Sequence, residues 1–195
     1  MKKTSAALAR AAVIAAVYAV CTVSIAPITY GAVQFRIAEC LCVLAFFYDE
    51  AVVGLTVGCF VANLFSPYGP LDIVLGTAAT LVSSLALNFC YKRIANKTIG
   101  FLTGVFFPIA VNALVVPISI LVAAPEAESY FIMAAQVGFG QAVVILSLGT
   151  LLYFVLFRLF KSGVLKSSAE NKNSSELYSD KNNSDNNSDN NENDR

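Results

Sequence analysis

The sequence predicts an all-α integral membrane protein: a bundle of six transmembrane helices, with both termini in the cytoplasm and a disordered polar C-terminal tail. Three observations support this fold class. Hydrophobic residues make up 57% of the chain and charged residues only 13%, whereas about a quarter of a soluble domain is charged. Apolar runs long enough to enter a membrane recur along the chain. The basic residues form clusters that can all share one side of a membrane.

Six apolar runs are the predicted helices. The first follows two lysines, as in a signal peptide, but a run of about 20 residues is longer than the core of such a peptide and fits a span. The second and third runs are separated by Tyr48, Asp49 and Glu50. One span through both runs would bury two carboxylates at about 2.5–3.5 kcal/mol each, so we expect two short helices that turn here. The runs are residues 6–26, 37–47, 51–65, 71–91, 99–124 and 130–160.

Clusters of basic residues set the number of spans, because Lys and Arg are enriched on the cytoplasmic side. Three clusters can share that side only if an even number of spans separates them. Six spans satisfy this condition with both termini inside, whereas five spans would leave two clusters outside. Within residues 1–166, only Arg36 then breaks the rule. The clusters are Lys2/Lys3/Arg10, Lys92/Arg93/Lys97 and Arg158/Lys161/Lys166.

The chain is expected to divide into a membrane domain, residues 1–166, and a disordered tail, residues 167–195. The first has ten basic and six acidic residues and the second three basic and seven acidic, so the formal net charge of zero hides two unlike regions. The tail is mainly Asn, Ser, Asp and Glu, which cannot bury enough apolar surface to offset the entropy of ordering. Neither region has the basic excess that is typical of nucleic-acid binding.

Sequence signals of catalysis are weak. The chain has no histidine, which excludes a histidine base, a histidine triad and a zinc–histidine site. It also lacks the phosphate-binding loop G-x-x-x-x-G-K-[ST] and the G-x-S-x-G elbow. Its five cysteines lie in apolar runs, as small buried thiols do. An intramembrane enzyme using Asp49, Glu50, Asp72 or a cysteine would need a converging pair, and no spacing presents one.

Small residues line the first run. Ala11, Ala15 and Ala19 are four residues apart, with Ala12 and Ala16 beside them, so one face of the predicted helix is nearly smooth. Small residues let helix backbones approach closely in lipid. The face is either a docking site for another helical subunit or an internal packing surface, and spacing does not decide between them.

The segment of residues 27–39 is polar although it lies between two apolar runs. Arg36 and Glu39 are three residues apart and share a face if a helix starts here, either as a structural ion pair or as part of a wall over a solute pocket. Other polar residues interrupt the spans, where such groups usually face a partner, water or a ligand. Those predicted toward the outside are Asn63, Asp72, Asn112, Gln136 and Gln141, and those toward the cytoplasm are Asp49, Glu50 and Asn88.

Three stretches resemble the QueT family of queuosine-precursor transporters: PITYGAVQFRIAE at 27–39, GCFVANLFSP at 58–67 and LDIVLGT at 71–77. The resemblance covers about residues 6–160. It implies the substrate-binding subunit (S component) of an energy-coupling factor importer, with six helices in a bacterial plasma membrane. Such a subunit needs no cofactor of its own. It binds solute outside and joins a transmembrane coupling (T) protein and two ATPase subunits, which use ATP. In S components an A-x-x-x-A pattern in the first helix contacts the coupling protein, and Ala11/Ala15, Ala15/Ala19 and Ala12/Ala16 match it.

The implied solute, a 7-deazaguanine-type precursor, suits the polar residues. Glu39 or Asp72 would accept two N–H groups of the base, amides would meet its remaining polar atoms, and Tyr30 or Phe35 would stack on the ring. The candidate substrate-binding residues are Tyr30, Gln34, Arg36, Glu39, Asn63, Asp72 and Asn112. Two alternatives stay open: a stand-alone secondary transporter or channel for a small solute, and an S component for a different vitamin.

Overall fold

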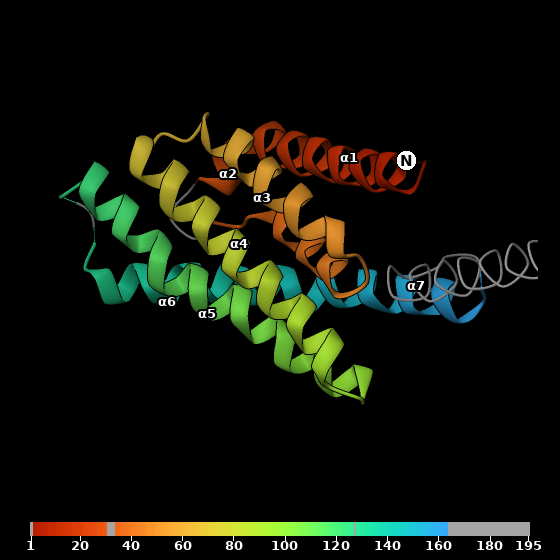
Figure 1. Ribbon diagram of the computed structural model, residues 1–195. Helices are drawn as coiled ribbons and strands as arrows, with labels where there is room; N and C mark the ends of the chain where they lie inside the picture. Colours follow the sequence, from red (N-terminus) through yellow and green to blue (C-terminus); the bar gives the residue numbers. More distant parts are fainter. Residues whose placement is uncertain (1, 31–33, 127, 164–195) are drawn as a thin grey trace, which may run out of the picture. The chain divides into compact units, whose positions relative to one another are not determined.

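The computed structural model describes residues 2–30, 34–126 and 128–163. These residues form helices and connecting turns without a strand, which confirms the all-α class for the part of the chain described. The chain divides into two units, Met1–Leu156 and Phe157–Arg195. The predicted tail and its boundary at residue 166 lie outside the described residues. In order, the elements are α1 (Lys2–Ser24), α2 (Ala26–Thr29), η1 (Ile37–Phe46), α3 (Asp49–Asn63), α4 (Pro70–Arg93), α5 (Lys97–Ala123), α6 (Tyr130–Val144), η2 (Ile145–Gly149) and α7 (Thr150–Lys161) (Figure 1).

Four helical runs in the described part are long and apolar enough to cross a membrane: Ser5–Ser24, Pro70–Arg93, Lys97–Ala123 and Tyr130–Lys161. Between the first two, after the four-residue α2, the chain forms two short helices, as predicted: η1 has 10 residues and α3 has 15. They separate at Phe47–Tyr48, whereas the sequence predicts the turn at Asp49–Glu50, which form the first turn of α3. With a rise of about 2.0 Å per residue in a 3₁₀-helix and 1.5 Å in an α-helix, each covers roughly 20 Å. A hydrocarbon core is about 30 Å thick. The structure therefore leaves the predicted count of six spans, and the side on which the termini lie, unconfirmed.

The 3₁₀-helix η1 lies in the middle of the unit Met1–Leu156. It contacts α1, α3, α4, α5, α6 and η2. A ten-residue 3₁₀-helix is unusual because its hydrogen-bond geometry is poor, so packing on many sides must stabilise it. Because η1 lies in the middle of the unit, Glu39 in η1 and Arg36 just before it are buried in the interior.

Helices α1 and α3 are in close contact because small residues face each other between them. A Cβ atom added to Gly54 would lie 2.6 Å from the carbonyl oxygen of Ala11, and one added to Gly58 would lie 2.8 Å from that of Ala15. The two glycines have the G-x-x-x-G spacing that allows close helix packing in membranes. One part of the predicted alanine face thus packs inside the unit.

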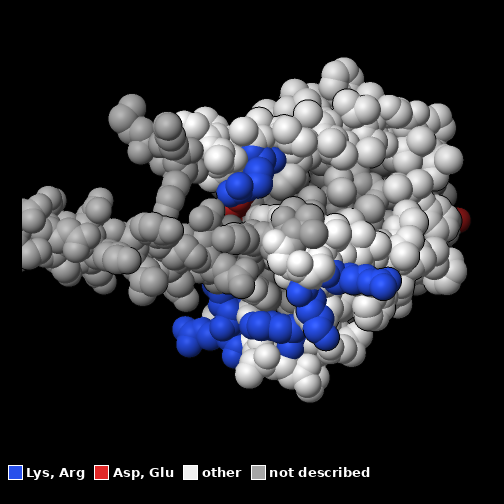
Figure 2. All heavy atoms as spheres, turned by 90° about the vertical axis from the view of Figure 1, so that its right-hand side faces the viewer, with Lys and Arg blue, Asp and Glu red and all other residues white. Residues whose placement is uncertain are grey.

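Polar contacts hold the starts of α1 and α3 and the end of α4 together. Arg10 forms an ion pair with Glu50. The Asp49 carboxylate accepts hydrogen bonds from Lys92 Nζ at 2.9 Å and from Asn88 Nδ2 at 2.8 Å. Two of the predicted basic clusters therefore contribute to one end of this unit, and Figure 2, which faces that end, shows Lys and Arg side chains gathered there.

The last helical run is continuous from Tyr130, with a π-helical turn, η2, between α6 and α7. Near this turn, the Tyr153 ring stacks on Phe101 of α5 with ring centroids 4.0 Å apart, and Phe46 of η1 packs against both rings. This aromatic cluster fills the interior on the basic-end side of η1. The polar residues of η1 and the segment before it lie on its other side.

Candidate functional site

A buried polar network begins at Arg36, whose side chain is only 3% exposed. Its Nη2 donates to Asn63 Oδ1 at 3.2 Å, at the end of α3, and lies 3.5 Å from Asp72 Oδ2, in the first turn of α4. Asn63 Nδ2 donates in turn to the Asp72 backbone carbonyl at 3.1 Å. Gly76 leaves room for this contact, because a Cβ atom there would lie 2.5 Å from Asn63 Nδ2. Three candidate residues from three elements thus meet.

Asp72 is fully buried, and protein donors reach both of its carboxylate oxygens. Ser66 Oγ donates to Oδ2 at 2.6 Å and Ser119 Oγ donates to Oδ1 at 2.9 Å. Ser119 belongs to α5, so the network links that helix to α4. A buried carboxylate persists only when an opposite charge and hydrogen bonds offset its desolvation. The Arg36 guanidinium and the two hydroxyls fill this role.

Glu39 is a second buried carboxylate and has its own set of donors. Tyr18 of α1 donates to Oε1 at 2.6 Å, Thr80 of α4 donates to the same oxygen at 3.4 Å, and the Cys42 thiol lies 3.1 Å from Oε2. Among the described residues, Arg36 forms its ion pair with Asp72 and not with Glu39. The sequence allowed either an ion pair between Arg36 and Glu39 or a wall over a solute pocket. The described structure does not form that ion pair.

Gln34 combines burial, an unusual backbone conformation and unpartnered polar atoms. Its φ angle of 48° lies in the left-handed region, which side chains other than Gly adopt rarely and at a cost. Its side chain is 1% exposed, and both amide atoms lack a hydrogen-bond partner in the described structure. Two nitrogens of Arg36, Nε and Nη1, lack partners as well. Buried polar groups are nearly always hydrogen-bonded, so these atoms have hydrogen-bonding capacity that the described protein groups do not use.

Two further amides are buried with unpartnered atoms, Asn112 of α5 and Gln141 of α6. Asn112 Oδ1 and both amide atoms of Gln141 have no hydrogen-bond partner among the described residues. Asn112 is seven residues before Ser119, so the two side chains share a face of α5, about two turns apart. The set of incompletely bonded polar groups therefore continues from the Arg36 network along α5.

The remaining predicted residues divide between this region and other surfaces. The Tyr30 hydroxyl donates to the Ala62 carbonyl at 2.8 Å, and the Tyr68 hydroxyl donates to the Tyr30 carbonyl at 2.7 Å. Tyr30 thus fastens the segment after α2 to the end of α3. Asn88 lies at the basic end, where it donates to Asp49, and its predicted place toward the cytoplasm stays a prediction. Gln136 is half-buried on α6 and donates to Glu128 at 2.7 Å.

Sequence reasoning missed the hydroxyl groups that hold the two carboxylates. Tyr18, Thr80 and Ser119 each lie within an apolar run. Hydroxyls in membrane helices commonly bond to the backbone of their own helix, so their presence carries little signal. Ser119 illustrates this, because its Oγ lies 2.8 Å from the Val116 carbonyl as well as 2.9 Å from Asp72 Oδ1.

The alanines predicted for docking lie on different sides of α1. Ala11 is buried, Ala15 and Ala19 are half-buried, and Ala12 and Ala16 are exposed. Contact with a coupling protein stays a prediction for all five. A surface hollow of about 330 Å³ lies close by, lined by Ala9, Arg10, Val13, Ile14, Leu44 and Tyr48.

Long apolar helices around a buried and incompletely bonded polar cluster are typical of membrane transport proteins. The comparison with known families gives the particular group. The chain belongs to the QueT transporter family, whose model matches residues 8–158.

A curated relative, the queuosine precursor transporter QueT of Lactococcus lactis subsp. cremoris (strain MG1363), is 36% identical over 73 residues. The matched segment is 36% of this chain and 43% of that protein, so the chain spans less than half the length of its relative. No solved structure matches the chain.

Proposed function

We propose that this chain is the substrate-binding S component of an energy-coupling factor importer for a queuosine precursor of the 7-deazaguanine type. The family supports transport as the activity. The observation that carries solute binding is the set of buried polar atoms without partners on Gln34, Arg36, Asn112 and Gln141. In a membrane such atoms are costly, so a polar solute that bonds to them would be held tightly.

The proposed orientation places this set toward the outside. Lys and Arg favour the cytoplasmic side, which makes the end with Arg10 and Lys92 the inner one. Helix α3 begins at that end with Asp49 and finishes at Asn63, so Asn63 and its partner Arg36 belong to the outer half. In this arrangement η1 and α3 act as two short spans of a six-helix bundle with both termini inside, in a bacterial plasma membrane.

The candidate residues take two roles in this proposal. Gln34, Arg36 and Asn112 contact the solute through their unpartnered atoms. Tyr30, Glu39, Asn63 and Asp72 are engaged by protein groups, and they hold the wall of the site. Energy comes from two ATPase subunits joined through a transmembrane coupling protein, so ATP acts on the partners and this chain needs no cofactor. The exposed Ala12/Ala16 side of α1 is the proposed contact with the coupling protein.

Solute binding by the purified protein tests the cargo. Aminomethyl and cyano precursors and queuine are titrated by calorimetry, with guanine, riboflavin and thiamine as controls. We expect one precursor to bind much more tightly than guanine. Arg36→Met should weaken binding at least tenfold, because it removes buried donors, whereas Lys92→Met at the basic end should not. A folded protein that binds none of the precursors would refute the cargo.

Co-purification tests the subunit role. We expect two ATPases and a coupling protein to be recovered with the tagged chain from its own membranes. Precursor uptake that persists in cells lacking those ATPases would instead favour a stand-alone transporter.

A further inference from the structure

Helices α5 and α6 bring Asn112 and Gln141 to the same level of the bundle. Val116 of α5 and Val137 of α6 belong to one buried cluster. Asn112 lies one turn before Val116, and Gln141 lies one turn after Val137. Because the chain reverses between Ala123 and Tyr130, both steps lead in the same direction along the bundle. The two side chains, 0% and 1% exposed, therefore occupy corresponding positions on neighbouring helices.

The side-chain amides of Asn112 and Gln141 keep donors and acceptors that no described protein group uses. Asn112 Nδ2 donates to the Pro108 carbonyl at 2.9 Å, which fixes the amide orientation and leaves Oδ1 as a free acceptor. Gln141 has both a free acceptor, Oε1, and a free donor, Nε2. The pair thus offers two free acceptor oxygens and the N–H groups of Gln141 Nε2, beside the second N–H of Asn112 Nδ2.

We propose, on the basis of the proposed function, that Gln141 and Asn112 together recognise the 2-amino-6-oxo edge of the base. That edge carries two donors, the ring N–H and the exocyclic amino group, beside one acceptor, the ring carbonyl. The Gln141 amide pairs with the ring N–H and the carbonyl, and Asn112 Oδ1 accepts from the amino group. A 6-amino base presents a donor and a ring acceptor, which the Gln141 amide can meet by turning over, because no described protein group fixes its orientation. Such a base lacks the 2-amino group, so Asn112 Oδ1 then faces no donor. Glu39 and Asp72 already accept from protein donors, which leaves this edge to the amides.

Three bases that differ only at this edge test the assignment: 7-deazaguanine, 7-deazahypoxanthine, which lacks the amino group, and 7-deazaadenine. We expect the wild-type protein to bind 7-deazaguanine at least tenfold more tightly than either of the other two, because only this base supplies the amino group to Asn112 Oδ1. Gln141→Leu should weaken the binding of all three bases tenfold or more, because each base loses its pair of hydrogen bonds to the amide. Gln141→Glu, which keeps the shape but loses the donor, should also weaken it, and thermal unfolding reports whether each variant folds.

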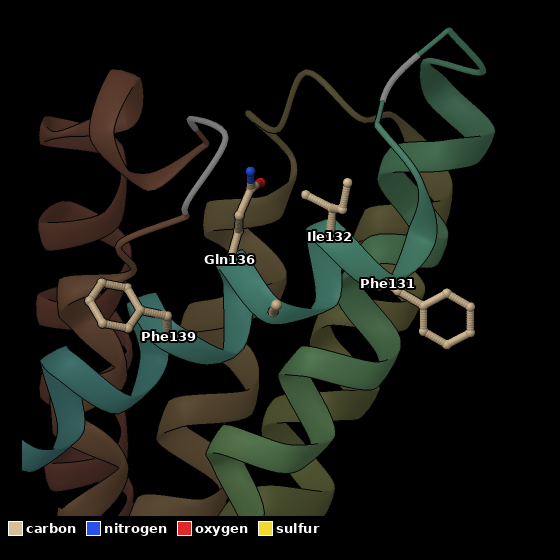
Figure 3. A pocket seen from close by; sticks show the side chains of 5 residues that line it. Phe131, Ile132, Gln136 and Phe139 are labelled. Carbon is tan, nitrogen blue, oxygen red and sulfur yellow. The ribbon is translucent and has the colours of Figure 1, made fainter.

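Gln136→Leu is the matched control, because it changes the same residue type on the same helix. Gln136 lines a surface hollow of about 490 Å³ with Phe131, Ile132, Ala135 and Phe139 (Figure 3). Phe131 and Phe139 are largely exposed there, so this is an outward surface of α6. We expect this variant to bind all three bases as the wild type does.

Asn112→Leu probes the amino group directly. If Asn112 accepts from that group, the variant loses at least tenfold in affinity for 7-deazaguanine and little for 7-deazahypoxanthine. Equal losses for the two bases would overturn the role of Asn112, and an unchanged affinity of Gln141→Leu for 7-deazaguanine would overturn that of Gln141. In either case the cargo would stand. A folded wild-type protein that binds neither these bases nor any precursor would refute the proposed function itself.

Discussion

Replacing Asp72 with alanine should destabilise the protein strongly. Asp72 is the carboxylate paired with Arg36, and its removal leaves a buried guanidinium without its counter-charge. Breaking such a buried pair from one side costs about 3–5 kcal/mol. The hydroxyl of Ser66 also loses its acceptor, whereas Ser119 keeps its contact with the Val116 carbonyl. With roughly 2–4 °C per kcal/mol for a protein of this size, the melting temperature should fall by about 6–20 °C.

Thermal unfolding in detergent, followed by circular dichroism, measures this effect. Lys92→Ala is the control, because it removes one member of an ion pair with Asp49 whose side chains are 52% and 48% exposed. Such a pair contributes about 0–1 kcal/mol. The double variant Arg36→Met/Asp72→Leu should recover most of the lost stability, since it removes both charges. An Asp72→Ala protein as stable as the wild type, or a double variant no more stable than the single one, would refute the account of Arg36 and Asp72 as a mutually dependent pair.

Three further substitutions test the packing and the site. Gly76→Ala places a methyl group against the Asn63 amide, so calorimetry should show solute binding weakened about tenfold; binding unchanged within twofold would contradict this. Gly58→Leu should push α1 away from α3 and cost about 3 kcal/mol or more, measured as a lower melting temperature. The exposed Val57→Leu is its control, and equal melting temperatures would argue against the close contact. Gln34→Gly should raise the melting temperature, because glycine adopts the left-handed conformation freely, and it should lower solute affinity. A variant with both a lower melting temperature and a lower affinity would mean that Gln34 has a structural role.

Local patterns were enough to place the helices and to single out buried polar residues. Apolar runs located α4 and α5 within two residues at each end, because continuous hydrophobicity is a strong signal in membranes. The charged residues Asp49 and Glu50 indicated the division between η1 and α3, although both lie in the first turn of α3. The 3₁₀ geometry of η1 left no comparable signal, since it depends on the helices packed around it.

The sequence could not predict which polar side chains pair with one another, because these pairs depend on how distant segments pack. Arg36 and Glu39 looked like a pair by spacing, yet Arg36 joins Asp72, 36 residues away, and Glu39 joins Tyr18 of α1. The alanine face of α1 and the two glycines of α3 are each visible in the sequence. Their contact is a property of the fold alone. Gln141 was noticed as a polar interruption, but its position opposite Asn112 follows only from the packing of α5 against α6.

The contact between α1 and α3 has a mechanical consequence. The backbones of Gly54 and Gly58 pack directly against the carbonyls of Ala11 and Ala15, with no side chain between the helices at these points to absorb a displacement. Helix α3 ends at Ala62 and Asn63, which accept hydrogen bonds from Tyr30 and Arg36. We therefore expect a displacement of α1 to move α3 with it, and through α3 the wall of the polar site.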